Sequence, residues 1–217
     1  MKDTVESGKA AQKNVVWIFP IIIILAGFVV SYISSSIINE WAFVPLMLFY
    51  WTSLLLVARP TKEKLAKWFA PPKGRVYYSL LAFIPVLFCI VAFVWGLQYV
   101  RGSILIILWI IFAVVNAFAE EVFWRGYLLD HLSWKPSVSI AYSTLMFSLS
   151  HPLLWGVFSI TNRSTIMVLP LLIMGLVWGF VYWKTKSLRY IVLAHFLIDI
   201  LNLSVWVFLN IYVPPVI

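Results

Sequence analysis

The fold is decided by residues 103–129, which read SILIILWIIFAVVNAFAEEVFWRGYLL. The stretch is almost continuously apolar up to residue 115, and it then carries two adjacent acids, Glu120 and Glu121, followed by Arg125. About 20 apolar residues allow a helix to cross a bilayer. The stretch therefore predicts a membrane-spanning helix that holds charged side chains.

Six further apolar runs accompany it, at residues 15–38, 41–58, 76–100, 137–160, 165–183 and 189–212. With 63% hydrophobic residues, 11% charged residues and a mean hydropathy of +0.98, the chain is far more apolar than soluble domains. The first run is longer than the roughly 7 to 15 apolar residues of a signal peptide, so we interpret it as a span. We predict an all-α, polytopic transmembrane helix bundle of about seven spans.

The sixteen Lys and Arg residues are unevenly distributed between alternate loops. A cytoplasmic N-terminus places thirteen of them in the cytoplasm, Arg125 within a span, and only Arg101 and Arg163 on the opposite side. Positively charged short loops resist translocation, so we expect this orientation. The net charge is +8, and the basic residues that produce it lie beside apolar runs. This position favours membrane lipid over nucleic acid as a partner. The small chain suggests a multi-pass protein of a bacterial plasma membrane.

Six ionisable side chains fall within the predicted spans: Glu120, Glu121, Arg125, His151, His195 and Asp199. A charged side chain at the centre of a bilayer costs about 2.5–3.5 kcal/mol, and residues this costly usually serve a function. We therefore take these six side chains as the candidate functional site.

Helix geometry assigns different roles to the two glutamates. Glu121 and Arg125 are four residues apart on one helix face, so we expect them to pair. Glu120 is rotated from Glu121 by about 100°, which leaves it free as the reactive carboxylate. The alternative is that both glutamates only neutralise Arg125.

The two histidines lie on separate predicted spans. His151 precedes Pro152, which loosens the helix just past the histidine. His195 and Asp199 share a helix face, and Asn202 lies on the same stripe. With Glu120, these side chains lie about 9 to 20 Å from the cytoplasmic span ends, so we expect one polar cavity that opens to the cytoplasm.

A carboxylate and two histidines in a water-accessible cavity suit peptide hydrolysis, because the carboxylate can take a proton from water while donors stabilise the oxyanion. A nucleophile is not indicated: G-x-S-x-G is absent, Cys89 lies in the third apolar run, and Ser148 and Ser150 have no evident base on their own helix face. HExxH is also absent, which leaves zinc bound by His151, His195 and a carboxylate as an open alternative.

Three sequence motifs carry a family resemblance. Glu120-Glu121-Val-Phe-Trp-Arg125 resembles EExxxR, Phe147-Ser-Leu-Ser-His151 resembles FxxxH, and His195-Phe-Leu-Ile-Asp199 resembles HxxxN/D. These are the motifs of the CAAX-processing and bacteriocin-processing (CPBP, or Abi) intramembrane proteases, and they occur here in the family's order.

The resemblance implies an endopeptidase related to the type II CAAX prenyl protease. The resemblance further implies that Glu120 and His151 activate water, and that His195 and residue 199 form an oxyanion site. The family has also been described as metal-dependent, which implies either no cofactor or a zinc ion bound by Glu120, His151 and His195. Position 199 is Asp where Asn is more usual, so Asp199 could instead orient His195 or bind the metal.

The resemblance also divides the chain. We expect a cytoplasmic tail at residues 1–14, accessory spans with a basic interfacial loop (59–75) at 15–102, and a catalytic core at 103–212. The expected substrate is a membrane-associated peptide or a lipidated protein. Two alternatives stay open: a non-catalytic bacteriocin-immunity, regulatory or scaffold protein of the same family, and a proton-coupled transporter.

Overall fold

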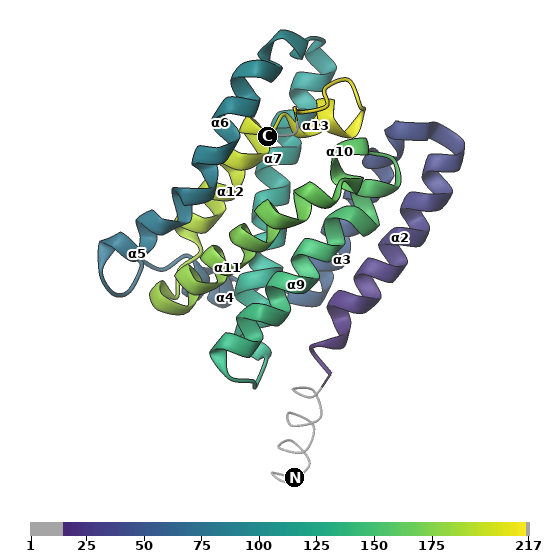
Figure 1. Ribbon diagram of the computed structural model, residues 1–217. Helices are drawn as coiled ribbons and strands as arrows, with labels where there is room; N and C mark the ends of the chain where they lie inside the picture. The colour runs from purple at the N-terminus through teal and green to yellow at the C-terminus, as the bar shows by residue number, and fades with distance from the viewer. Residues whose placement is uncertain (1–14, 216–217) are drawn as a thin grey trace.

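The computed structural model describes residues 15–215, and within that range every regular element is helical. The predicted tail at residues 1–14 lies outside the described residues. The main helices (Figure 1) are α2 (Ile18–Ile38), α3 (Phe43–Ala58), α4 (Lys62–Trp68), α5 (Val76–Leu80), α6 (Ile84–Gly96), α7 (Ser103–Glu121), α8 (Leu128–His131), α9 (Pro136–Leu154), α10 (Ile160–Arg163), α11 (Val168–Thr185), α12 (Arg189–Leu201) and α13 (Ser204–Phe208). The all-α prediction is confirmed for this range, as expected where backbone groups must be satisfied without water.

Four stretches are long and apolar enough to cross a membrane: Ile18–Ala58, Val76–Tyr99, Ser103–His131 and Thr165–Thr185. The first contains two helices, α2 and α3, which turn at Asn39 and pack against each other. Neither α9 nor α12 is among the four stretches, so the count of about seven spans stays a prediction.

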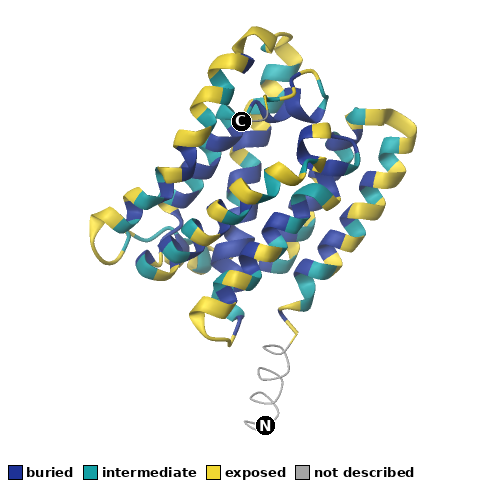
Figure 2. Ribbon diagram, in the orientation of Figure 1, coloured by how far each residue is buried: buried dark blue, intermediate teal, exposed yellow. Residues whose placement is uncertain are grey.

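The outer surface of the bundle is rich in apolar side chains, as expected for an integral membrane protein. Leu25, Ile37 and Phe88 are 63%, 74% and 68% exposed. Figure 2 shows that exposed positions follow the outer faces of α2 and α6, whereas buried positions gather where helices meet. The apolar exterior suits contact with lipid, and the interior holds the polar side chains.

The helices α9 and α11 approach each other closely at two glycines. A Cβ atom added at Gly175 would lie 2.7 Å from Thr144 Cγ2, and one added at Gly179 would lie 2.8 Å from Ile140 Cγ2. Small residues spaced four apart allow membrane helices to pack this tightly. The contact fixes α9, the helix that carries His151.

A π-helical segment, Val122–Tyr127, continues α7 directly after Glu121. Its wider turn is accompanied by a hydrogen bond from Ser143 Oγ on α9 to the Trp124 carbonyl at 2.9 Å. Such segments occur mostly as short insertions at functional sites. Here the segment contains Arg125.

The basic loops gather at one end of the bundle, where α4, α5, the loop after α8 and the end of α11 lie together (Figure 1). Asp130 connects these elements: it accepts hydrogen bonds from Lys67 Nζ (2.7 Å), Trp68 Nε1 (3.1 Å) and the Tyr182 hydroxyl (3.0 Å). The predicted interfacial loop at 59–75 therefore contains a short helix, α4, anchored to α8 and α11.

The last apolar run is interrupted rather than continuous. Helix α12 ends at Leu201, Leu203 adopts φ 54°, and α13 begins at Ser204. Ser204 Oγ lies 2.7 Å from both the Asp199 carbonyl oxygen and Asn202 Oδ1. Asn202 therefore takes part in the turn that follows α12, although the sequence placed it on the functional stripe.

Candidate active site

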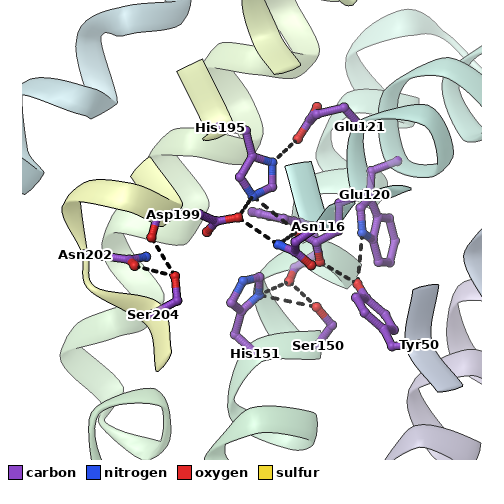
Figure 3. Close-up of polar contacts among 12 residues, drawn as sticks. Tyr50, Asn116, Glu120, Glu121, Ser150, His151, His195, Asp199, Asn202 and Ser204 are labelled. Carbon is purple, nitrogen blue, oxygen red and sulfur yellow. Dashed lines mark hydrogen bonds and ion pairs between the residues drawn. The ribbon is translucent and has the colours of Figure 1, made fainter. Parts of the chain in front are cut away.

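Five of the six predicted side chains form one buried polar cluster where α7 and the π segment meet α12. Figure 3 shows the acids of this cluster with His195, and His151 on α9 faces the same region. The five are Glu120, Glu121, Arg125, His195 and Asp199, and none is more than 5% exposed. Burial of this many ionisable groups requires that they satisfy one another. Their contacts show how they do so.

Glu121 and Arg125 form the expected pair, with Arg125 Nη1 donating to Glu121 Oε1 at 2.8 Å. Glu121 Oε1 also lies 2.7 Å from His195 Nδ1, a contact that the helix spacing did not predict. The Arg125 guanidinium lies 4.4 Å from the centre of the Phe147 ring and 5.3 Å from that of Trp178, within the range of cation–π attraction. Glu121 therefore binds an arginine and a histidine at once.

Glu120 occupies the other side of the His195 ring. Its Oε2 lies 3.4 Å from His195 Nε2, and Asp199 Oδ2 lies 3.6 Å from the same nitrogen. Asn116 Nδ2 donates to both carboxylates, at 3.3 Å to Glu120 and 3.1 Å to Asp199. The nitrogens His195 Nε2 and Asn116 Nδ2 thus alternate with the oxygens Glu120 Oε2 and Asp199 Oδ2. We call this arrangement the four-atom ring.

His151 contacts its own helix rather than the acids. Its Nδ1 lies 2.9 Å from the Phe147 carbonyl, which fixes Nδ1 as the donor and leaves Nε2 as the acceptor. The imidazole packs edge-on against the Phe147 ring at 4.8 Å. His151 is less buried than the five clustered side chains, and Figure 3 shows it beside the region of Asn116 and Asp199.

Ser150 has a basic neighbour that the sequence reasoning missed. Its Oγ lies 3.3 Å from His151 Nδ1. The hydroxyl donates instead to the Phe147 carbonyl at 2.7 Å, the same oxygen that His151 Nδ1 contacts. Because Nδ1 carries the proton in this arrangement, it cannot act as the base for Ser150, and the contact does not make a nucleophile.

Three side chains that contact the cluster escaped the sequence reasoning: Asn116, Tyr50 and Trp51. Asn116 had a signal, because it is a polar residue in an apolar run four positions before Glu120. Tyr50 and Trp51 had none, because aromatic residues are common in membrane spans. They reach Glu120 and Asn116 from α3, at sequence separations of 70 and 65 residues.

The structure also shows a cavity of about 320 Å³ at the end of the bundle opposite the basic loops, lined by Gln98, Tyr99, Arg101, Leu105, Trp206 and Ile211. It lies beyond the acids: Trp206 packs edge-on against Trp109 at 5.2 Å, and Trp109 Nε1 donates to the Asp199 carbonyl at 3.0 Å. The buried acids themselves are packed by protein.

The arrangement does not fit a metal ion as it stands. Among residues 15–215, no three His, Cys, Asp or Glu side chains converge as metal ligands. His195 Nε2 faces two carboxylates, whereas the hydrogen-bond contacts of His151 are with Phe147 and Ser150 of its own helix and not with the acids. The zinc site at Glu120, His151 and His195 stays a prediction, and we derive no chemical step through a metal.

Residues 102–201 match the family model described as type II CAAX prenyl endopeptidase Rce1-like. Comparisons with curated proteins and with solved structures gave no match. The matched segment contains all six predicted site residues and spans α7 to α12. It also bears out the resemblance carried by the three motifs. Residues 102–201, just under half of the chain, are therefore similar to the type II CAAX prenyl endopeptidases, which supports the resemblance to the CPBP intramembrane proteases.

Proposed function

We propose that the protein is an intramembrane endopeptidase that hydrolyses a peptide bond in a membrane-associated or lipidated peptide by glutamate-activated attack of water. The observation that carries the proposal is the position of Glu120 Oε2, which lies 3.4 Å from His195 Nε2 and 3.3 Å from Asn116 Nδ2. A buried base thus lies beside two nitrogen donors. General-base hydrolysis of a peptide bond requires this pairing of base and oxyanion donors.

In the proposed reaction, a water molecule enters beside Glu120, and His151 Nε2 holds it. Glu120 removes a proton as the water oxygen attacks the carbonyl carbon. The resulting oxyanion accepts hydrogen bonds from His195 Nε2 and Asn116 Nδ2. Collapse of the intermediate breaks the carbon–nitrogen bond, and the proton passes from Glu120 to the leaving nitrogen.

Asp199 serves a different role in this scheme from that of an oxyanion donor. Its Oδ2 accepts from Asn116 Nδ2 at 3.1 Å and lies 3.6 Å from His195 Nε2. An ionised carboxylate only accepts hydrogen bonds. Asp199 therefore orients the two donors, and Asn116 supplies the amide.

The proposal includes the orientation of the chain. A cytoplasmic N-terminus and about seven spans would place the end of the bundle that holds α4 and the loop after α8 in the cytoplasm, because positively charged short loops resist translocation. The catalytic core at 103–212 would then receive its substrate from the cytoplasmic side of a bacterial plasma membrane.

Replacing Glu120 by Gln tests the function directly, because it removes the base and keeps the size of the side chain. We expect the cleavage rate to fall about 100- to 10,000-fold while membrane insertion is retained. Cleavage is measured on prenylated peptides with purified protein in liposomes, and by comparing peptide termini in membrane proteomes. Glu63→Gln, at an exposed position of α4, is the control. A fully active Glu120→Gln protein would contradict the proposal.

Metal removal tests the alternative mechanism. Because no three ligands converge in the described part of the chain, we expect cleavage to persist after treatment with a chelator. The measurement is activity before and after chelation, together with metal analysis of the purified protein. Stoichiometric zinc, and loss of activity that added zinc restores, would replace this mechanism with a metal-dependent one.

A further inference from the structure

Helix α3 lies outside the matched segment 102–201, yet it contacts the proposed base. The Tyr50 hydroxyl donates to Glu120 Oε1 at 2.7 Å and accepts from Trp124 Nε1 at 3.2 Å (Figure 3). Tyr50 is fully buried, and Glu120 is 1% exposed. The Tyr50 oxygen accepts the hydrogen bond from Trp124 Nε1, and its own proton is left to point at Glu120.

The next residue of α3 contacts the proposed amide donor. Trp51 Nε1 donates to Asn116 Oδ1 at 3.0 Å. An amide whose oxygen accepts from Trp51 must present its nitrogen to the other side, where Glu120 and Asp199 lie. The indole ring is held in turn by Phe112, at 5.7 Å between ring centres.

The two contacts match the geometry of the helices that make them. Asn116 and Glu120 are four residues apart on one face of α7, and Tyr50 and Trp51 are adjacent on α3, which packs against α7 and the π segment. Each α3 side chain binds the oxygen that points away from the four-atom ring. The remaining atoms, Glu120 Oε2 and Asn116 Nδ2, are thereby aimed into it.

We infer that Tyr50 and Trp51 are positioning residues for the reaction: Tyr50 fixes the carboxylate of Glu120, and Trp51 fixes the amide of Asn116. The inference rests on the proposed function for its catalytic meaning. It assigns α3, an accessory helix by sequence, to the active site.

Tyr50→Phe tests the inference because it removes only the hydroxyl. A hydrogen bond to a charged group in the active site governs the chemical step more than substrate binding, so we expect kcat to fall about 10- to 100-fold with KM changed less than about threefold. Trp51→Phe should lower kcat in the same way. The matched control is Tyr212→Phe, which removes a hydroxyl that donates to the Ala92 carbonyl at 2.7 Å, away from the acids. It should leave kcat unchanged.

Infrared spectroscopy provides a second readout that does not depend on cleavage. The band of the Glu120 carboxyl group is identified as the one lost in Glu120→Gln. We expect Tyr50→Phe to shift this band and Tyr212→Phe to leave it in place. An unshifted band in Tyr50→Phe, or a kcat within about twofold of the wild-type value, would overturn the inference. If the wild-type protein cleaves no peptide, the proposed function fails, and the infrared band still decides whether Tyr50 positions Glu120.

Discussion

Glu121 contacts a buried arginine and a buried histidine with one oxygen atom. Its Oε1 accepts from Arg125 Nη1 and lies 2.7 Å from His195 Nδ1, whereas its Oε2 has no hydrogen-bond partner among residues 15–215. Arg125 is held further by the aromatic faces of Phe147 and Trp178. Removal of one member of such a group leaves the others charged and buried, which costs more than the pair itself contributes.

Arg125→Met tests this arrangement at the residue scale. The substitution leaves Glu121 without its arginine, and we expect it to lower the free energy of unfolding by about 3–5 kcal/mol. The double variant Glu121→Gln/Arg125→Met should lose less than the sum of the two single variants. Thermal unfolding in detergent measures all three. The control is Lys67→Met. The Lys67 side chain is 66% exposed, so loss of its ion pair with Asp130 should lower the free energy of unfolding by at most about 1 kcal/mol. Equal losses in Arg125→Met and Lys67→Met would contradict the expectation.

Residues that depend on helix spacing could be predicted from the sequence, and residues that depend on packing could not. The i, i+4 spacing gave the pair Glu121–Arg125 and the shared face of His195 and Asp199. It could not show that Glu120 and Glu121 contact opposite nitrogens of one imidazole, because that depends on where α12 crosses α7. The contact of Tyr50 with Glu120 could not be predicted either, because it depends on where α3 packs against α7.

At the scale of elements, the contact between α9 and α11 determines where His151 lies. Gly179→Leu would place a side chain where even a Cβ atom comes within 2.8 Å of Ile140. We expect the substitution to push the helices apart, lower the melting temperature by several degrees and reduce cleavage. Leu176→Ala, on the same helix but 49% exposed, is the control and should change both little. Unchanged melting of Gly179→Leu would show that the close contact is not required.

The helices themselves could largely be predicted from the apolar runs, but their interruptions could not. Each of the seven runs contains a helix of the structure. Pro152 does not end α9, which continues to Leu154 before a short 3-10 turn. The π segment has no sequence signature, because its extra residue per turn depends on contacts such as that of Ser143 with the Trp124 carbonyl.

At the scale of the whole molecule, the described basic loops lie at one end of the bundle (Figure 1). The loop before α7, which contains Arg101, and α10, which ends at Arg163, lie at the other end. The orientation proposed from the loop charges predicts opposite accessibility of Lys135 and Arg163, which are both exposed. In a Cys89→Ser background, we expect a cysteine at position 135 to react only with reagent on the cytoplasmic side. A cysteine at position 163 should react only from the outside. Labelling of both from one side would reject the orientation.

The hydrogen bonds from α3 also bear on how separable the parts of this molecule are. Sequence divides the chain at residue 102, but the oxygen atoms of Glu120 and Asn116 that face α3 find their donors on the other side of that boundary. A fragment that begins at the matched segment would retain every motif and lack two of the donors that orient them. Residue 102 therefore marks where the sequence similarity begins. A segment moved into another protein to carry this site would also have to include α3.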